Sequence, residues 1–391
     1  MLLDLKLTAL APLAFARTKP GAQFRQSLPY VPGAAIFGAL AQILDATGQF
    51  EIDLLRESIC HNAYPAYVGD AWSHPYPATA LKPKGEEKDP GFDSLVTRVC
   101  WEQMQPSALM VTTDQYAVAE GCYTLMGQPN PDGLYHRGQI GKRKIEQRVL
   151  TRVAINRRRG TAEDARLYSP LVLSEMTNGG PTQFLGDLAL PDPLAALLSN
   201  DRTLYLGGRQ SSGLGKVEAR TAQAQPEDAA AIRQRVAALT RRFQAQAGRY
   251  AALRGSHKDW SIPDTSIFTV NLLADALLVQ QGWLPTNVVD AAMLGEETGV
   301  AAELIRAFTT PTLLGGWNVT WQQPKPTAVG TALGSLFVFQ TPEPLTDQQC
   351  QALADLQARG IGERRQEGYG QIRICDEFHL VDETLPKLKE G

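Results

Sequence analysis

Two glycine-rich segments constrain the fold of this chain more than any other feature. The first is Gly-Gly-Arg-Gln-Ser-Ser-Gly-Leu-Gly at residues 207–215, and the second is Gly-Ile-Gly-Glu-Arg-Arg-Gln-Glu-Gly-Tyr-Gly at residues 360–370. Each ends in Gly-x-Gly and runs directly into a strand pattern, at residues 216–220 and 371–375. A loop of this kind occurring twice before a strand indicates that one architectural unit is repeated. At 391 residues, the chain is long enough for two domains.

The second half of the chain follows the order of a known small fold. Patterns rich in β-branched and aromatic residues predict strands at residues 266–273, 317–322, 335–340 and 371–375. A helical pattern interrupted near Gly295 and Gly299 occupies residues 287–308, and a second helical pattern occupies residues 347–358. Thr346 is the expected N-cap of the second helix, and Gly360 its stop. This order is the ferredoxin-like arrangement, in which two helices cover one face of a four-stranded sheet, and we expect the other face to be left for a partner.

The first half has the same beginning and the same end, separated by a long insertion. Residues 2–10 predict the opening strand, and residues 34–44 predict a helix with large apolar side chains on one face and small ones on the other. Residues 203–206 and 216–220 predict strands on either side of the glycine loop. Residues 50–200 are too many for a connection within such a fold, so they must hold inserted elements.

We therefore predict an α+β protein with two ferredoxin-like, or RRM-like, domains. The first domain spans residues 1–225 and includes the insertion at about 50–200, and the second spans residues 256–391. A helix at residues 226–255 joins them, with Pro226 in its first turn and Gly255 after its end. We expect the arginines of this helix to form a solvated face.

The distribution of charge predicts a nucleic-acid contact, although the net charge of −3 does not. Between residues 137 and 160 there are nine basic residues and one acidic residue, Glu146. The strand patterns at residues 151–156 and 166–173 predict a β-hairpin whose turn, residues 157–160, carries three consecutive arginines. Like charges held together cost free energy without an anionic partner, so we expect this hairpin to grip a polynucleotide backbone. The alternative is an ordinary surface hairpin that happens to be basic.

Common nucleotide and metal motifs do not fit the sequence. A P-loop requires lysine after its second glycine, whereas Leu214 follows Gly213. A dinucleotide-binding loop leads into a helix, whereas both loops here lead into strands. The five cysteines form no Cys-x-x-Cys pair, so we predict neither a metal site nor a disulfide framework. We expect no cofactor.

The N-terminal residues predict a strand rather than a targeting segment. Residues 1–15 are largely apolar, but Asp4 and Lys6 alternate with apolar residues and no basic leader precedes them. No stretch approaches the roughly 18 apolar residues that a membrane span needs. We therefore expect a cytoplasmic protein without membrane contact.

Three segments together resemble the repeat-associated mysterious protein (RAMP) superfamily of CRISPR systems. They are Pro32-Gly33…Gly38-Ala39-Leu40 at the start of the first helix, residues 153–162 (VAINRRRGTA), and the loop at residues 208–215. The loop at residues 362–370 is similar to the same motif. More narrowly, the chain resembles the double-RAMP subunit of type III-D CRISPR effector complexes, although residues 50–134 match nothing in that family.

This resemblance implies a non-catalytic RNA-binding subunit of a ribonucleoprotein that acts in antiviral defence. Such subunits hold the repeat-derived 5′ handle of the CRISPR RNA and contact the large signature subunit and the RAMP backbone subunits, so they meet target RNA only indirectly. Base pairing reads the sequence, while the protein holds the backbone and shape of the RNA. The glycine loops would hold the handle, and the basic hairpin would separate handle from guide.

The predicted RNA contacts come from the helix start, the basic stretch and the two glycine loops. They are Gly33, Gly38, Lys142, Arg143, Lys144, Arg152, Asn156, Arg157, Arg158, Arg159, Gly208, Arg209, Ser211, Ser212, Gly213, Gly215, Lys216, Arg364, Arg365, Gly368, Tyr369 and Gly370. Glycine lets backbone N–H groups approach phosphates closely, and the basic side chains supply positive charge. For Gly33 and Gly38, close packing of the helix on its own sheet is the alternative.

Catalysis is the main alternative function, because some RAMP relatives are ribonucleases. One kind uses a histidine as general base, and the best placed of the five histidines is His136, beside Arg137. Another kind cuts target RNA with an aspartate and a divalent metal, for which Asp164 and its neighbour Glu163 are the candidates. No histidine lies in the first helix or in a glycine loop, and Asp164 has a simpler use in a salt bridge, so we predict no catalysis. A protein-only assembly factor is the third hypothesis.

Overall fold

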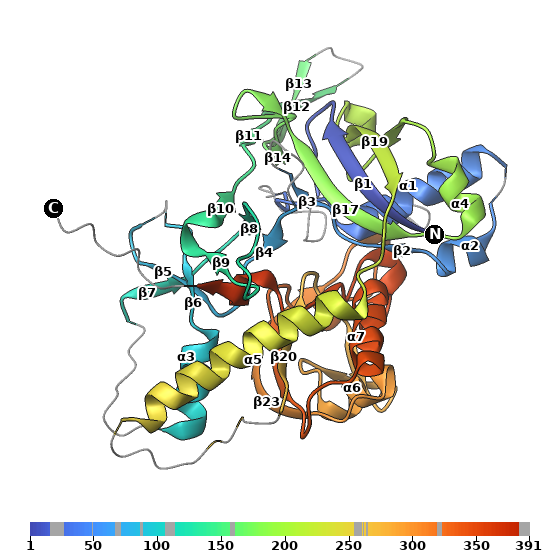
Figure 1. Ribbon diagram of the computed structural model, residues 1–391. Helices are drawn as coiled ribbons and strands as arrows, with labels where there is room; N and C mark the ends of the chain where they lie inside the picture. Colours follow the sequence, from blue (N-terminus) through green and yellow to red (C-terminus); the bar gives the residue numbers. More distant parts are fainter. Residues whose placement is uncertain are drawn as a thin grey trace.

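The computed structural model describes residues 1–15, 27–48, 50–66, 72–86, 89–105, 114–156, 161–253, 260, 262, 265–318 and 323–382. Among these residues, helices are combined with sheets whose strands pair antiparallel, apart from one short parallel pair. Two larger sheets form the centres of two modules, one from the first part of the chain and one from the last (Figure 1). No helix in these ranges has the length and apolar character needed to cross a membrane.

The sheet of the first module is built around the opening strand, in the order β18-β19-β1-β17-β2, with β3 also paired to β17. The strands are β1 (Leu2–Ala9), β2 (Ile59–Cys60), β3 (Tyr64–Pro65), β17 (Gln183–Ala189), β18 (Arg202–Tyr205) and β19 (Lys216–Gln223). Side chains alternate along β1, so Leu3, Leu5 and Leu7 are buried in the core while Asp4 and Lys6 lie on the opposite face. The three strands predicted for this module are confirmed, apart from small shifts of their ends.

Helix α1 (Gly33–Ala46) packs on this core with α2 (Ile52–Arg56) and α4 (Asp192–Leu197). Its residues Ile36, Leu40 and Leu44 are buried in the same hydrophobic cluster as β1. The N–H group of Gly33, the first of the helix, donates to Asn62 Oδ1 at 2.8 Å. The helix predicted at residues 34–44 is therefore confirmed.

The sheet of the second module has the order β23-β28-β20-β29, and every neighbouring pair is antiparallel. Its elements follow one another as β20 (Ile267–Leu272), α6 (Ala291–Thr298), β23 (Glu303–Phe308), β28 (Leu336–Gln340), α7 (Asp347–Arg359) and β29 (Ile372–Ile374). Thr346 caps α7 through reciprocal hydrogen bonds with Gln349, and the helix ends at Gly360, as predicted. Two ribbons flank this sheet, β21 (Leu278–Gln280) with β22 (Leu284–Thr286) and β24 (Pro311–Leu314) with β27 (Ala328–Thr331).

The second strand of this sheet lies elsewhere than the sequence predicted. The helix predicted within residues 287–308 is confirmed as α6, which ends at Gly299, near one of the expected interruptions, but the prediction is wrong beyond that point, because Glu303–Phe308 forms β23. Of the strand predicted at residues 317–322, residues 319–322 lie outside the described part of the chain. The rest is β25 (Trp317–Asn318), which pairs with β26 (Gln323–Pro324) outside the main sheet.

The face of the second sheet that we expected to be open is covered by the chain itself. Every residue of β20 is buried, so both faces of the sheet centre are occupied. Helix α5 (Ala229–Ala251) and helix α3 (Leu95–Met104), which comes from the insertion, share one hydrophobic cluster with β20 (Figure 1). Polar groups close the rest, since His379 bonds to Asn271 at 2.8 Å and to Asp93 at 2.8 Å.

Besides α2, α3 and α4, the insertion contains mainly short strands, and its basic hairpin is confirmed in the backbone. β12 (Arg152–Asn156) pairs with β13 (Thr161–Tyr168), and together they extend beyond the ribbon of β11 (Gln147–Val149) and β14 (Leu171–Leu173) (Figure 1). The return strand begins at Thr161 rather than at 166, and residues 157–160 lie outside the described ranges. The remaining strands of the insertion are β4 (His74–Pro75), β5 (Ala80–Pro83), β6 (Phe92–Asp93), β7 (Tyr116–Val118), β8 (Cys122–Leu125), β9 (Tyr135–His136), β10 (Ile140–Arg143), β15 (Met176–Thr177) and β16 (Gly180–Pro181). A last short strand, β30 (Val381–Asp382), follows the second module.

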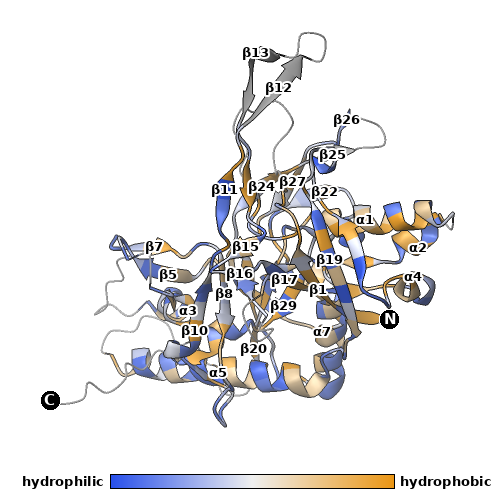
Figure 2. Ribbon diagram, turned by 90° about the horizontal axis from the view of Figure 1, so that it is seen from above, coloured by the Kyte–Doolittle hydropathy of each residue, from blue (hydrophilic) through white to orange (hydrophobic). Residues whose placement is uncertain are grey.

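The linking helix is confirmed as α5, but it begins after its N-cap Asp228, so Pro226 lies before the helix rather than in its first turn, and Gly255 lies outside the described residues. Hydrophilic and hydrophobic residues alternate along it (Figure 2), and its predicted apolar stripe is buried. The expected solvated arginine face is wrong for Arg235, which is only 8% exposed. Its guanidinium pairs with Glu227 at 2.8 Å and donates to the carbonyl of Ile374. The helix is therefore joined to the second module by polar as well as apolar contacts.

Candidate nucleic-acid groove

The two glycine loops fold alike, residue for residue. In each, an arginine in the left-handed conformation opens a 3-10 turn, and a glycine in the same conformation closes it. The matched positions are Gly207 and Gly362, Arg209 and Arg364, Gly213 and Gly368, and Gly215 and Gly370, all with φ between +56° and +89°. Because a non-glycine residue at positive φ is uncommon, the shared conformation of Arg209 and Arg364 supports a repeated unit.

The hydrogen bonds of the two loops correspond as well. Gly215 N–H donates to Pro12 O and Gly370 N–H donates to Asp275 O, each at 2.9 Å. Leu206 N–H donates to Gly215 O in the first loop, and Ile361 N–H donates to Gly370 O in the second. Likewise, Gly208 N–H donates to Ala14 O, and Glu363 N–H donates to Leu277 O. Each loop is thus fastened to the segment that follows the first strand of its own module.

The glycines at the ends of the loops are required by space as well as by φ. A Cβ atom on Gly215 would overlap the carbonyl oxygen of Leu206, and one on Gly370 would overlap that of Ile361. The N–H groups of Gly213 and Gly215 already donate to protein carbonyls. These glycines therefore hold the loops in shape, and their contact with RNA stays a prediction.

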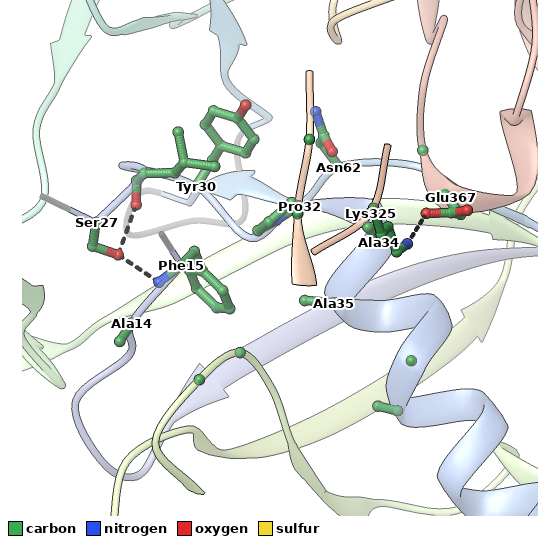
Figure 3. Close-up of a pocket in the computed structure, with 18 of the residues that line it drawn as sticks. Ala14, Phe15, Ser27, Tyr30, Pro32, Ala34, Ala35, Asn62, Lys325 and Glu367 are labelled. Carbon is green, nitrogen blue, oxygen red and sulfur yellow. Dashed lines mark hydrogen bonds and ion pairs between the residues drawn. The ribbon is translucent and has the colours of Figure 1, made fainter. Parts of the chain in front are cut away.

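Both loops open onto one groove between the modules, which has a volume of about 640 Å³. The first loop contributes residues 207–210, and the second contributes residues 367–369. The other walls come from α1, from the segments around Phe15 and Tyr30, and from the connection between β24 and β27 (Figure 3). Segments that are far apart in the sequence therefore converge at this groove.

Helix α1 presents its small residues to the groove. Ala34, Ala35, Gly38 and Ala39 all line it, while the large apolar residues of the same helix point into the core. A Cβ atom on Gly38 would meet no heavy atom within 4 Å, so the space beside this residue is open. A wall without bulky side chains allows a flat or extended ligand to lie against the helix.

The rest of the lining is mostly apolar and includes four aromatic side chains. Phe15, Tyr30, Tyr205 and Tyr369 supply ring surface. Lys325 pairs with Glu367 at 2.7 Å (Figure 3). Burial alone would raise the pKa of the Glu367 carboxyl, but hydrogen bonds from Arg364 and Lys325 hold it below the usual value. Such a lining suits the bases and riboses of a single strand at least as well as its phosphates.

The arginines of the second loop are engaged with the protein. Arg364 pairs with Glu367 and lies over the ring of Tyr369, 5.1 Å from its centroid. Arg365 pairs with Glu297 and donates to the carbonyl of Gly362. We expected both guanidinium groups to supply charge to RNA, whereas here their charges are balanced by carboxylates.

Two glycines predicted as RNA contacts instead meet each other at the seam between the modules. A Cβ atom on Gly33 would lie 2.7 Å from Gly368 Cα, and one on Gly368 would lie 2.8 Å from Gly33 Cα. Nearby, Asn62 N–H donates to Gln371 Oε1 at 3.2 Å, and the hydroxyl of Tyr64 donates to the carbonyl of Leu273. Gly33 is therefore closely packed, against Cys60 of its own sheet and against Gly368 of the other module, and its contact with RNA stays a prediction.

The other predicted contacts are spread over the molecule. Ser211, Ser212, Gly213, Lys216 and Gly370 belong to the loops or the strands after them but do not line the groove. Lys142 and Arg143 lie on β10 and Lys144 directly follows it, in the insertion. The side chains of Arg143, Arg152 and Asn156 lie outside what the structure describes, as do Arg157, Arg158 and Arg159 entirely.

Sequence reasoning missed most polar residues of the groove, among them Asn62, Asp275 and Lys325. These three residues reach it from three separate segments. Asp275 Oδ1 accepts a hydrogen bond from Leu333 N–H at 2.9 Å, and its backbone holds Gly370. Only an alignment of the two modules with each other would have found Asp275, because it stands where Pro12 stands in the first.

The candidate catalytic residues lie apart from the groove. His136 is exposed on β9, at the start of a short 3-10 turn, and does not line the groove. Glu163 and Asp164 are on β13, in the projecting hairpin, and their side chains lie outside the described part.

No family model and no curated protein matches this chain. Among solved structures, it is similar to a chain of the Type III-B Cmr-beta complex bound to cognate target RNA and AMPPnP, with a TM-score of 0.45, 10% identity and 86% of each chain covered. For the same complex bound to cognate target RNA the TM-score is 0.44, the identity is 12% and the coverage is again 86% of each chain. The crystal structure of Cmr4 gives a TM-score of 0.24 at 10% identity, covering 57% of this chain and 100% of that one. At such low identities and TM-scores, no conclusion rests on these similarities.

Proposed function

We propose that this chain is a non-catalytic RNA-binding subunit of a type III CRISPR ribonucleoprotein effector, and that it holds the 5′ repeat-derived handle of the CRISPR RNA. The observation that carries the proposal is the convergence of two matching glycine loops and the small-residue face of α1 on one groove. In the sequence, the start of this helix and the loop at residues 208–215 are two of the three segments that resemble the RAMP superfamily, and the loop at residues 362–370 is similar to the same motif. In this role the chain would contact the large signature subunit and the RAMP backbone subunits.

We interpret both modules as ferredoxin-like RAMP domains of the type III-D double-RAMP subunit. In support, the second module has the expected order of two helices and four antiparallel strands. In the first module, β1 likewise lies between β17 and the strand that follows the glycine loop, β19. The matching loop hydrogen bonds are a second, independent argument for two copies of one unit.

The groove can be tested by filling it from α1. Gly38→Leu places a branched side chain in open space on a helix, where leucine is also the better helix former. We expect affinity for repeat-derived RNA to fall about tenfold, equivalent to about 1.4 kcal/mol, while the fold is retained. Fluorescence anisotropy with labelled repeat RNA measures the affinity.

Gly248→Leu is the matched control, because Gly248 also lies in a helix, α5, with no heavy atom within 4 Å of an added Cβ. It should leave RNA affinity unchanged. Equal affinity in the two variants and in the wild-type protein would remove the groove from the proposal.

We also propose that the chain does not cut RNA. Among the described groove-lining residues there is no histidine, and the carboxylates of Asp275 and Glu367 are already hydrogen-bonded. Labelled precursor RNA and guide–target duplex, incubated with the protein with and without Mg²⁺, should remain intact. Cleavage that is lost in a His136→Ala or an Asp164→Ala variant would establish the ribonuclease alternative.

A further inference from the structure

A second cavity, which we call the seam cavity, lies on the same seam between the modules. Its volume is about 490 Å³, and it is lined by β1, β17, the residues just before α5, and β29 with the segment after it, among others. Residues that are adjacent in the sequence line different spaces: His61 lines the seam cavity, whereas Asn62 lines the groove. Likewise, Leu273 lines the seam cavity, whereas Ala274 lines the groove. The proposed RNA groove makes no use of the seam cavity.

His61 gives this cavity a buried ring nitrogen that lacks a hydrogen-bond partner among the described residues. The residue is 2% exposed, and its Nδ1 lies 2.6 Å from Asp187 Oδ2. The carboxylate favours a proton on Nδ1, which leaves the lone pair on Nε2. Among the described residues Nε2 has no hydrogen-bond partner. Buried polar atoms are rarely left in this state, so a donor from outside the chain is expected.

The lining of the cavity is also negatively charged. Four carboxylates line it (Asp4, Asp187, Glu227 and Glu377), against one guanidinium, that of Arg373, which leaves an excess of three negative charges with the histidines neutral. Arg373 is already paired with Glu227 and Glu377. Asp4 lies directly across from Asp187 in the β1–β17 pair and forms no ion pair within the described ranges.

Aromatic residues complete the lining. Tyr64, Trp72, Tyr123 and Tyr135 all border the cavity. Aromatic rings attract organic cations through their π-electrons, and carboxylates and a nitrogen lone pair accept the N–H groups that such cations carry. The combination matches a guanidinium or a primary ammonium group better than it matches an anion or a neutral ligand.

A metal ion fits these groups less well. The described residues with ligand atoms at metal-binding spacing are His74, Asp376 and Glu377, and His61 is not among them. Asp376 accepts hydrogen bonds from the Tyr123 hydroxyl and from Phe378 N–H, and Glu377 is paired with Arg373. His61 and Asp4 are therefore not members of the group of described residues whose ligand atoms lie at metal-binding spacing.

We propose that the seam cavity binds an organic cation, a guanidinium or primary ammonium group that donates a hydrogen bond to His61 Nε2 and balances the charge of Asp4 and Asp187. The cation can come from a side chain of a neighbouring protein or from a free polyamine. The proposal does not depend on RNA binding in the groove.

The test uses the full chain with three small probes. Agmatine carries both N–H cations, tetramethylammonium carries the charge without any N–H donor, and inorganic phosphate is the anionic control. Calorimetry should show binding of agmatine, weaker binding of tetramethylammonium and none of phosphate. The histidine Cε1–Hε1 NMR signal that His61→Gln removes should shift on addition of agmatine. No binding of agmatine, or no preference for it over tetramethylammonium, overturns the proposal.

Asp4→Asn is the decisive variant, because Asp4 is exposed enough for the fold to tolerate the change. It should weaken agmatine binding roughly fivefold, as the loss of one partly exposed charge predicts, and leave RNA binding unchanged. Asp201→Asn, an exposed aspartate outside the cavity, should bind like the wild-type protein. Equal affinity for agmatine in both variants overturns the proposal. Tighter binding of the tripeptide Gly-Arg-Gly than of spermidine assigns the cation to a protein side chain, and the reverse assigns it to a polyamine.

Discussion

Two glycines of the first loop allow the free-energy cost of a side chain at positive φ to be measured separately from the cost of a steric clash. Gly213 and Gly215 have φ of +81° and +89°, but an added Cβ meets nothing at Gly213 and the carbonyl of Leu206 at Gly215. We expect Gly213→Ala to lower the free energy of unfolding by about 1 kcal/mol and Gly215→Ala to lower it by about 3 kcal/mol. Urea denaturation of the two variants measures the difference. Equal losses would mean that the loop relaxes around the new methyl group.

Glu227 makes the stability of the fold depend on pH. Burial alone would raise its pKa, but Arg373 and Arg235 lower it from 4.5 to about 2. A carboxyl whose pKa is lower in the folded state stabilises the fold above pH 4.5, and this contribution is lost as the pH falls towards 2. Allowing for its partial exposure, we expect a loss of about 2 kcal/mol that is missing in Glu227→Gln. Urea midpoints from pH 6 down to about pH 2.5 test this, and parallel profiles for the two proteins would contradict it.

Which residues of the site could be predicted depends on whether their signal is local. The glycines of the loops and the small residues of α1 were found because turn and helix preferences act over a few neighbours. Asn62 and Lys325 reach the groove only through long-range packing, so nothing around them in the sequence marks them. Arg364 and Arg365 look available in the sequence, because their partners Glu367 and Glu297 become partners only in the folded chain.

Among the elements, the hairpin of β12 and β13 is the one that projects, and its tip carries the densest positive charge in the sequence. Replacing Arg157, Arg158 and Arg159 together by alanine should weaken RNA binding. The slope of log K against log salt should fall by about 2, since each phosphate contact to a single strand contributes about 0.7. Anisotropy titrations from about 50 to 300 mM salt give the slope.

Arg249→Ala, a change at an exposed arginine of α5, is the control for that experiment and should leave the slope as it is. If the triple variant keeps the wild-type slope, the hairpin does not touch the RNA backbone.

Strand β23 shows why element prediction failed where it did. Its residues Glu303–Phe308 have no clear alternation, and they follow the helix α6 closely, so the sequence pattern predicts an interrupted helix that continues to residue 308. What makes them a strand is pairing with β28, more than twenty residues later in the chain. Helix α7, by contrast, carries its own capping box and stop signal, and it was predicted almost to the residue.

At the scale of the whole molecule, the insertion of the first module completes the core of the second. Helix α3 shares one cluster with α5 and β20, and Asp93 bonds to the fully buried His379. We expect a fragment of residues 226–391 to be unstable alone, because the apolar surface that α3 covers would be exposed. Proton NMR should show poor dispersion for the fragment, and co-expression with residues 1–225 should restore it. A well-dispersed spectrum of the fragment alone would show that α3 is dispensable.

The contact between Gly33 and Gly368 joins the modules through backbone atoms, with no side chain between them that could change its rotamer. The floor of the groove beside this contact therefore has a fixed width, which is set when the chain folds and not when a ligand binds. In the proposed complex, the conformational entropy lost on binding is therefore mainly that of the RNA strand, which has to adopt an extended conformation to fit the groove.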